Sequence, residues 1–203
     1  MLEGRTLGCV RGERTLFRGV DFTLESGALL RVAGENGSGK TSLLRIVCGL
    51  SPPADGEVRW NGDNIRQLRE DYSRQLVYVG HSNALKDDLT AQENVAVGSA
   101  IAGLEPSGAE ALEALKRFGV GLCAGLPARV LSQGQRRRVA LAKLALSAAA
   151  LLWVLDEPFT ALDKAAVEGL EALLSEQLAR GGAVMLTTHQ EVAIAANGRR
   201  LDL

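Results

Sequence analysis

The chain has 203 residues, of which 46% are hydrophobic, so it is long enough to bury a sizeable core in a single domain. Its 23 Lys and Arg residues against 24 Asp and Glu residues leave a formal net charge of −1, which excludes a global basic field that would attract nucleic acid. The richest apolar run, residues 144–155, is too short to cross a bilayer, and the first residues lack the layout of a secretory signal. Cys9, Cys48 and Cys123 have no metal-ligand spacing, so we expect a reducing cytoplasm and three buried thiols.

The first part of the chain is predicted to consist mainly of strands, with one helix after a glycine-rich turn. A polar turn joins the first two strands, which predicts a small antiparallel sheet. The third strand is an apolar run that leads directly into the glycine-rich turn. The expected strands are residues 2–10, 15–24, 28–33, 57–60 and 75–79, and the helix covers residues 41–50.

The second part of the chain is predicted to be mainly helical, with two buried strands. A break at residues 106–108 divides the first helical block in two, and residues 82–148 together form a candidate helical subdomain. Strands that alternate with helices predict an α/β fold with an open parallel sheet, whose ligands bind beyond the carboxyl ends of the strands. The remaining elements are helices at 132–148 and 164–179 and strands at 151–155 and 183–187.

A glycine-rich segment between a predicted strand and a predicted helix fits the pattern G-x-x-x-x-G-K-[ST], whose backbone N–H groups bind phosphate. In such a loop the lysine, here Lys40, reaches the β and γ phosphates, and the hydroxyl of Thr41 ligates Mg²⁺. A glycine-rich turn with an incidental lysine is the alternative, which the flanking elements disfavour. The predicted phosphate-binding residues are Gly34, Glu35, Asn36, Gly37, Ser38, Gly39, Lys40, Thr41 and Ser42.

Two carboxylates follow the apolar strand predicted at residues 151–155. At the carboxyl edge of a parallel sheet they would lie beside the phosphate loop. Asp156 then suits a role at Mg²⁺, directly or through water, and Glu157 is placed to polarise an attacking water. A strand end that merely caps the next turn is the alternative, and the neighbouring phosphate loop weakens it.

The segment Leu131, Ser132, Gln133, Gly134 and Gln135 precedes a long predicted helix. Ser132 suits an N-cap and Gly134 permits a close backbone approach, so this helix start can bind an anion. The segment resembles the Leu-Ser-Gly-Gly-Gln signature of the ATP-binding cassette (ABC) family, with Gln133 in place of a glycine. The resemblance covers nearly the whole chain. It implies a single ABC-type nucleotide-binding domain of the P-loop NTPase class, residues 1–203, with a RecA-like core, a small antiparallel β subdomain and an α-helical signature subdomain.

Two further segments follow in the order of the ABC family. Residues 161–163, Ala-Leu-Asp, resemble the D-loop, which implies a place for Asp163 at a nucleotide-bridged dimer interface. Residues 187–189, Thr-Thr-His, resemble the switch segment whose histidine closes on the γ phosphate, so Glu157 and His189 are the expected catalytic residues. A lone histidine after a strand is otherwise a surface or cap residue. The resemblance also implies that two copies of the chain sandwich two ATP molecules head to tail, each signature facing the other copy's γ phosphate.

Two positions depart from the pattern of the family. After the strand at residues 75–79 the family places a glutamine that touches Mg²⁺, whereas this chain has His81. A neutral imidazole can still ligate a metal, and a solvent-facing loop histidine is the alternative. The aromatic residue expected on the adenine ring aligns best with Arg11, whose guanidinium can stack on a purine. Phe17 is a less well aligned candidate and is expected in the core.

A run of three arginines, residues 136–138, lies in the first turns of the signature helix. Successive helical residues point in different directions, so the run does not form one basic patch. We interpret it as a solvated helix face rather than a nucleic-acid surface, while individual arginines at the subunit interface or the nucleotide remain an open alternative.

Residues 78–94, YVGHSNALKDDLTAQEN, together with residues 14–17, are similar to the ATPase subunits of bacterial cytochrome c maturation systems. This resemblance implies an ATPase at the cytoplasmic face of the inner membrane, bound to integral subunits of the B, C and D type, whose hydrolysis of ATP releases a haem-loaded chaperone. Docking is expected in the groove beside His81 and on the helices after Asp88. His81 and His189 are the only histidines and Cys-x-x-Cys-His is absent, so no direct haem binding is expected.

Other classes of protein remain as alternatives. The ATPase subunit of another small ABC exporter shares every catalytic motif, and so does a non-transport ABC ATPase. The interval between the phosphate loop and the signature is too short for the coiled coil of repair cassettes. A small P-loop kinase would not explain the signature or His189. A scaffold without turnover is disfavoured because the lysine, both carboxylates and the histidine are all present. The expected ligands are therefore ATP and Mg²⁺, and nucleic acid is not expected.

Overall fold

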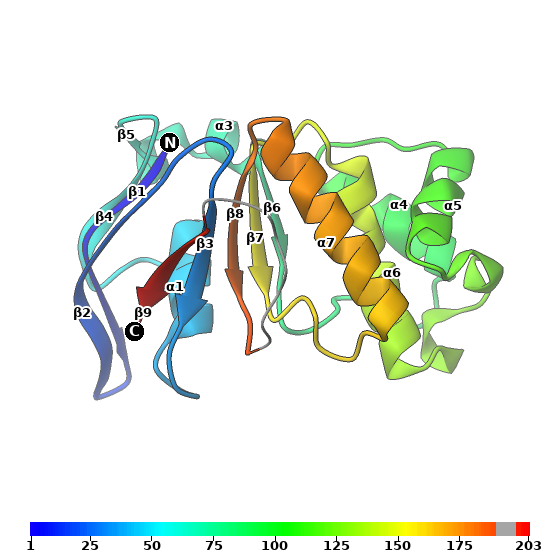
Figure 1. The fold of residues 1–203 in the computed structure, drawn as a ribbon, viewed down its shortest axis with the longest axis horizontal. Coiled ribbons are helices and arrows are strands. Elements are labelled where there is room, and N and C mark those ends of the chain that lie inside the picture. The colour runs from blue at the N-terminus through cyan, green and yellow to red at the C-terminus, as the bar shows by residue number, and fades with distance from the viewer. Residues whose placement is uncertain (190–197) are drawn as a thin grey trace.

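A computed structural model describes residues 1–189 and 198–203 and contains two sheets (Figure 1). The antiparallel sheet has the order β2-β1-β4-β5 and the parallel sheet has the order β6-β7-β8-β3-β9. The strands are β1 (Leu2–Arg11), β2 (Arg14–Leu24), β3 (Leu29–Ala33), β4 (Asp55–Trp60), β5 (Asp63–Asn64), β6 (Leu76–Val79), β7 (Leu152–Asp156), β8 (Ala183–Thr187) and β9 (Gly198–Asp202). The helices are α1 (Lys40–Val47), α2 (Ile65–Leu68), α3 (Glu70–Ser73), α4 (Ala91–Ile101), α5 (Gly108–Arg117), α6 (Gln133–Leu146) and α7 (Lys164–Ala179), with 3₁₀ turns at Gly121–Cys123 and Ala128–Val130.

The parallel sheet is buried on both faces, because its strands are apolar at successive positions. On β7, Leu152 and Val154 belong to the core cluster shared with α1 and the antiparallel sheet. Trp153 and Leu155 point to the other face and belong to the cluster shared with α4, α5, α6 and α7. Figure 1 shows α7 crossing one face of this sheet while α1 lies behind it. The two cores thus meet at the sheet whose carboxyl edge was predicted to bind the ligand.

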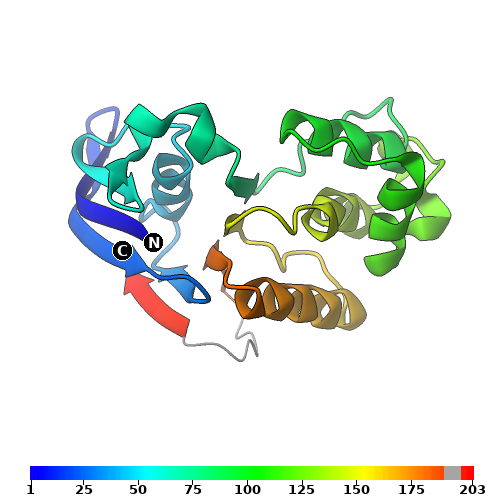
Figure 2. The same ribbon diagram turned by 90° about the horizontal axis from the view of Figure 1, so that it is seen from above.

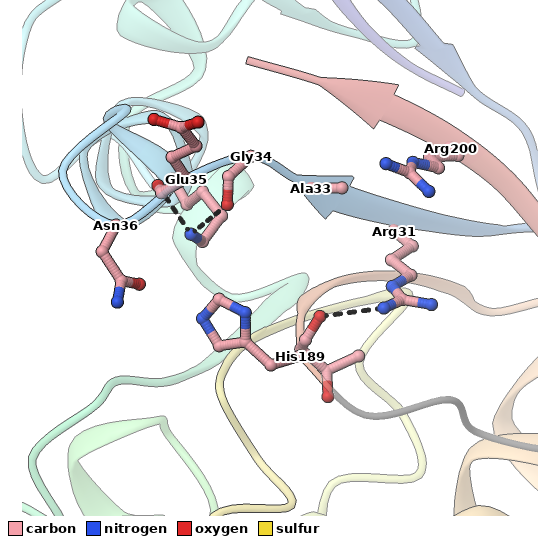
Figure 3. Close-up of a pocket in the computed structure, with 9 residues that line it drawn as sticks. Arg31, Ala33, Gly34, Glu35, Asn36, His189 and Arg200 are labelled. Atoms are coloured by element: carbon pink, nitrogen blue, oxygen red, sulfur yellow. Dashed lines mark hydrogen bonds between the residues drawn. The ribbon is translucent and has the colours of Figure 1, made fainter.

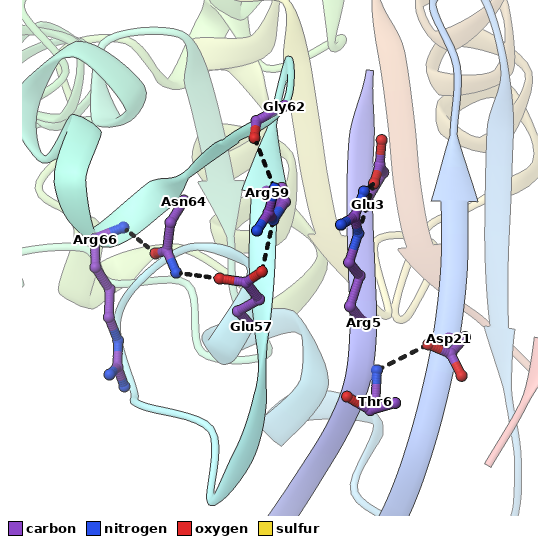
Figure 4. Close-up of polar contacts among 9 residues, drawn as sticks. All are labelled: Glu3, Arg5, Thr6, Asp21, Glu57, Arg59, Gly62, Asn64 and Arg66. Carbon is purple, nitrogen blue, oxygen red and sulfur yellow. Dashed lines mark hydrogen bonds and ion pairs between the residues drawn. The ribbon is translucent and has the colours of Figure 1, made fainter.

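The antiparallel sheet carries polar contacts on its exposed face (Figure 4). The carboxylate of Glu57 accepts hydrogen bonds from Arg59 Nε at 2.6 Å and from Asn64 Nδ2 at 2.7 Å. These two bonds stabilise the charged form and lower the pKa of Glu57 below its usual value. In β1 the register shifts between Gly4 and Leu7, and Thr6, with a φ of +46°, donates its backbone N–H to Asp21 Oδ1 at 2.8 Å. The bulge is therefore tied to β2 by a side chain.

Gly56 lies where β4 passes closest to β1, and we expect a side chain there to destabilise the fold. It has a φ of +77°, and an added Cβ would lie 2.2 Å from the carbonyl oxygen of Arg5. We expect Gly56→Ala to lower the free energy of unfolding by about 2–4 kcal/mol, through both backbone strain and the clash. Urea denaturation measures this loss. Gly62→Ala is the matched control, because Gly62 has a φ of +94° and open space around it. Equal losses in the two variants would contradict the clash.

The helical end of the molecule contains α4, α5 and α6, which are green to yellow-green in Figure 2. α4 and α5 each begin with a capping box, formed by Thr90 with Glu93 and by Ser107 with Glu110. The predicted break at residues 106–108 thus coincides with the start of α5. Buried residues on these helices pack against α6 in one core cluster. The boundaries proposed for a helical subdomain, residues 82–148, stay a prediction.

The predicted parallel sheet, antiparallel sheet and long helices are confirmed, with small shifts at their ends. The prediction missed β5, α2 and α3, because elements of two to four residues are too short for a periodic pattern. It also missed β9, whose sequence Gly-Arg-Arg-Leu-Asp has little strand character and which pairs with β3 at an edge. No helix among the described residues is long and apolar enough to cross a membrane.

The expectation of three buried thiols is correct for two of them. Cys9 and Cys48 are buried, and burial raises the pKa of the Cys48 thiol well above its usual value. Cys123 is only half-buried, because it lies in a 3₁₀ turn near the surface, where its Sγ accepts a hydrogen bond from Gln135 Nε2 at 3.5 Å.

Candidate nucleotide site

The glycine-rich loop joins β3 to α1 at the carboxyl edge of the parallel sheet. Lys40, the first residue of α1, donates its Nζ to the carbonyl oxygens of Gly34 at 2.8 Å and Glu35 at 3.0 Å (Figure 3). Gly37 has a φ of +84° with open space where a Cβ would stand. At Gly39 a Cβ would lie 2.9 Å from the ring of Phe17, so only glycine allows the loop to pack this closely on β2.

Asp156, at the end of β7, connects this strand to helix α1 and to the neighbouring strand β8. The carboxylate is 2% exposed, and its Oδ2 accepts a hydrogen bond from Thr41 Oγ1 at 2.7 Å. Its Oδ1 accepts a second bond from Thr187 Oγ1, also at 2.7 Å. The same Thr187 hydroxyl accepts the backbone N–H of Glu157 at 2.9 Å. The start of α1 and the ends of β7 and β8 are thus held together at one point.

Glu157 and His189, the two predicted catalytic residues, lie side by side. Glu157 Oε1 is 3.4 Å from His189 Nε2, and their side chains are 16% and 60% exposed. Glu157 has a φ of +48°, which is a strained conformation for a residue with a side chain. Strain of this kind persists only where surrounding contacts hold the backbone, and it is concentrated at functional sites.

A cavity of about 670 Å³ lies in front of the loop and has the size of a nucleotide-binding pocket. A second cavity of about 500 Å³ adjoins it and is lined by Gly34 and Glu35 as well as by Asn36, Lys40 and His189, which the two share (Figure 3). The predicted residues that line the larger cavity are Asn36, Gly37, Gly39, Lys40, Thr41, Ser42, His81, Asp156, Glu157 and His189. Residues from the phosphate loop, α1, the end of β7 and the segments after β6 and β8 therefore converge here.

Arg11, the expected adenine platform, lines neither of these cavities. It lies at the end of β1, where its Nη2 donates to Ser51 Oγ at 3.3 Å. Arg14 and Leu16 of β2 line the larger cavity instead, because the hairpin returns β2 over the phosphate loop. Phe17 is buried in the core, as expected.

The signature segment starts α6 away from both cavities. Ser132 Oγ accepts the N–H of Gln135 at 3.2 Å, and Gln135 Oε1 accepts the N–H of Ser132 at 2.8 Å, which confirms the predicted cap. Ser132 and Gln133 are exposed. A Cβ on Gly134 would lie 3.0 Å from the carbonyl oxygen of Ala161, so the signature packs on the segment before α7.

Asp163 caps the N-terminus of α7, where its Oδ1 accepts the N–H of Ala166 at 2.9 Å. Its Oδ2 lies 3.5 Å from Arg138 Nη1, so it is also linked to α6. Within one copy of the chain, Asp163 and the signature residues therefore lie together but do not reach the phosphate loop.

His81 is exposed and also lines a groove of about 330 Å³ next to the larger cavity. At the side of this groove, Lys143 donates its Nζ to the carbonyl oxygen of Tyr78 at 2.9 Å. Burial lowers the pKa of Lys143, and burial with the nearby Asp156 carboxylate raises the pKa of Tyr78 to about 12. Thr41 lines both spaces, so the groove and the cavity are neighbours.

Arg137, like Arg14 and Leu16, is a residue near this site that the sequence interpretation missed. A solvated face was expected for the arginine run, but Arg137 is 4% exposed and donates to main-chain carbonyls of the loop after β6 and of Asp156 and Glu157. Leu141 and Leu144 lie four and seven positions further along α6 and are buried. This i, i+4, i+7 spacing was a signal that Arg137 lies on the buried face.

The oxygen ligands at the loop are suited to a Mg²⁺ ion that binds together with a nucleotide. They are not suited to a metal that is held by protein side chains alone. No group of three or more His, Cys, Asp or Glu side chains suited to a metal occurs among residues 1–189 and 198–203. The adjacent Thr41 hydroxyl and Asp156 carboxylate are hard oxygen donors, which Mg²⁺ prefers, with phosphates and water as the other ligands. Ser38 Oγ is buried without a hydrogen-bond partner, as expected of a loop that binds an additional polar ligand.

The fold and this site define a P-loop nucleotide-binding domain, and comparisons with known proteins narrow that class. Residues 17–160 match the ABC transporter family. The chain is 26% identical to the dimeric bacterial ABC transporter cassette MJ0796, with a TM-score of 0.84 over 100% of this chain and 94% of that one. A post-hydrolysis dimer of the same cassette, bound to ADP and Pi, gives a TM-score of 0.81 at 27% identity, over 94% and 88% of the two chains.

Curated relatives are similar along the whole chain. One from Nitrosospira multiformis is 54% identical over 203 residues, which is 100% of this chain and 98% of that protein. One from Salmonella typhi is 48% identical over 100% of this chain and 97% of that protein. Both are named cytochrome c biogenesis ATP-binding export protein CcmA. The chain therefore belongs to the ABC transporter family and, within it, to the cytochrome c biogenesis ATP-binding export proteins, and it is an ATPase that binds ATP.

Proposed function

We propose that this ATPase powers a cytochrome c biogenesis export complex at the cytoplasmic face of a bacterial inner membrane, where its turnover drives release of a haem-loaded chaperone. Full-length identity of 48–54% to relatives that are named for this process supports the proposal. In this proposal integral subunits of the B, C and D type provide the membrane path and handle haem, while this chain binds none itself.

The observation that carries the hydrolytic mechanism is the cluster around Asp156. Mg²⁺ bound with ATP would neutralise phosphate charge and polarise the phosphorus for attack. Thr41 and Asp156 are the proposed ligands, with His81 at the edge of the same cavity as a further one. Lys40 leaves the carbonyls of the loop to bind the β and γ phosphates, as the loop amides wrap them.

Glu157 is the proposed base that accepts a hydrogen bond from the attacking water and orients it toward the γ phosphate. His189, 3.4 Å away, donates to the γ phosphate and stabilises the charge that develops there. Thr187 holds the backbone N–H of Glu157 and the Asp156 carboxylate with one hydroxyl, so the base and the proposed metal ligand are oriented together.

A second copy of the chain completes the site in this proposal. The residues Leu131, Ser132, Gln133, Gly134, Gln135 and Asp163 lie outside the cavities of their own copy. The N-terminus of α6 presents exposed residues and the positive end of the helix dipole, which suits the γ phosphate bound by the opposite copy. The structural relatives described as dimers support a pair of copies, which is head to tail in this proposal.

Capture of partners from native membranes tests the biological assignment. The full chain is expressed with an affinity tag in its own host, membranes are solubilised in detergent, and partners are identified by mass spectrometry. We expect cytochrome c maturation membrane subunits, and no Soret band from the chain after it is separated from them. Matched purification of the Lys40→Ala variant shows whether capture depends on nucleotide. A different permease would overturn the haem assignment and leave the ATPase mechanism intact.

A further inference from the structure

We propose that Arg137 is a positioning residue for ATP hydrolysis, whose guanidinium ties residues 80–83 to the backbone of Asp156 and Glu157 and so orients the Glu157 carboxylate. The inference rests on the proposed role of Glu157 as the base. It deepens that role by naming the side chain that holds the base and joins it to the loop that carries His81.

The two ends of the guanidinium contact two different segments. Nη2 donates to the carbonyl oxygens of Asp156 at 2.9 Å and Glu157 at 2.8 Å. Nη1 donates to the carbonyl oxygen of Gly80 at 3.0 Å and to Asn83 Oδ1 at 3.3 Å. A planar fork with several donors suits this bridge, whereas a lysine ammonium carries a single point charge.

Because Arg137 is buried, its guanidinium depends on these hydrogen bonds for stabilisation. Arg137 is 4% exposed, and within residues 1–189 and 198–203 no carboxylate lies at ion-pair distance from it. A buried cation is costly unless polar groups compensate it, and here carbonyl dipoles do so. Burial lowers the pKa of Arg137, while the nearby negative charges of Asp156 and Glu157 oppose that effect.

The contact between Arg137 and Glu157 matters for function because the backbone of Glu157 is strained. The residue has a φ of +48°, which is a strained conformation for a residue with a side chain and must be held by its surroundings. Its N–H is fixed by Thr187 and its carbonyl by Arg137, so both of its backbone polar groups are held. Without the guanidinium the following peptide can rotate toward a relaxed conformation, which would swing the carboxylate away from the water that it orients.

The same side chain makes the placement of Glu157 depend on the loop after β6. Gly80 and Asn83 flank His81, and the loop lines the groove proposed to receive a membrane subunit. If this loop shifts when a membrane subunit docks, the guanidinium must move with it. That movement would change the position of the Glu157 backbone. Arg137 is therefore a physical link from the docking groove to the proposed base.

Steady-state kinetics of the purified full chain test the inference. We expect Arg137→Gln to lower kcat for MgATP by about tenfold to a hundredfold, with KM changed by less than about threefold, because nucleotide contacts remain while the base is misplaced. Arg137→Lys keeps a charge without the fork and should recover part of the loss. Arg74→Gln is the matched control, since Arg74 is exposed and precedes β6, at the opposite end of the strand from the loop.

A double variant separates positioning from a general structural effect. Combined with Glu157→Gln, Arg137→Gln should cause no further loss of residual hydrolysis, because both changes act on one carboxylate. ATP-dependent pairing of Glu157→Gln copies should persist in the double variant. Unchanged kcat in folded Arg137→Gln overturns the inference, and so does a loss of pairing that parallels the loss of kcat.

If Arg137→Gln does not fold, Arg137→Lys decides. A kcat within about twofold of wild type then overturns the inference, and a lower kcat at unchanged KM supports it. Full hydrolysis by the single variant Glu157→Gln would instead refute the proposed base, which distinguishes the two failures.

Discussion

Replacing Glu157 with glutamine is expected to reduce ATP hydrolysis by about a hundredfold to a thousandfold while ATP binding is retained. A general base contributes rate factors of this order, and an amide of equal size cannot accept the proton of the attacking water. The proposed phosphate contacts come from the loop and α1, which the substitution does not touch. Release of phosphate under saturating MgATP measures the loss, and equilibrium binding of ATP measures what is retained.

The same variant should accumulate as an ATP-bound pair. If hydrolysis ends the ATP-bound pairing of two copies, a chain that binds but does not cleave ATP stays paired. Size-exclusion chromatography with ATP would detect this as a shift from one copy to two. Glu70→Gln is the matched control, because Glu70 is an exposed glutamate on α3. Unchanged hydrolysis would remove Glu157 from its proposed role.

Replacing Lys40 with alanine is expected to weaken ATP binding by about tenfold to a hundredfold and to lower hydrolysis by at least a hundredfold. Charge-assisted hydrogen bonds contribute about 1.5–3 kcal/mol each, and a cation on the β and γ phosphates also stabilises the transition state. In the structure the ammonium lies on two carbonyls of the loop itself, so it is already next to the phosphate position. Isothermal titration with ATP and steady-state kinetics measure the two effects.

Lys116→Ala is the matched control for this loss. Lys116 is an exposed lysine on α5 that pairs with Glu113, so its removal should leave both binding and turnover unchanged. Thermal denaturation without nucleotide should show the same stability for Lys40→Ala and wild type within about 1 kcal/mol, because the half-buried lysine donates only to carbonyl oxygens of its own loop. Unaltered ATP affinity in Lys40→Ala would show that another group holds the phosphates.

Local patterns were sufficient for the parts of the site that are continuous in the chain. The phosphate loop, the carboxylates after β7 and the histidine after β8 each follow a buried strand, and parallel strands bring their carboxyl ends to one edge. The meeting of Thr41, Asp156 and Thr187 was therefore predictable in outline. The hydrogen bonds that Asp156 accepts from the two threonine hydroxyls follow from that common edge.

Contacts between distant elements needed the tertiary structure. By its position relative to the family pattern, Arg11 was expected to stack on the adenine ring. In the structure the β1–β2 hairpin brings Arg14 and Leu16 to the cavity instead. Arg137 was hidden in a basic run, because charge composition does not say which residue of three faces the core.

The amino-acid sequence by itself determined the class of the protein, the order of its main elements and the position of the loop proposed to bind phosphate, since strand, loop and helix patterns are local. Only the tertiary structure decided which carbonyl oxygens Arg137 contacts, that Glu157 has a left-handed backbone, and that the signature lies away from its own phosphate loop. The physical reason is that these features depend on packing between segments that are far apart in the chain, where sterics and hydrogen-bond geometry act through space rather than along the chain.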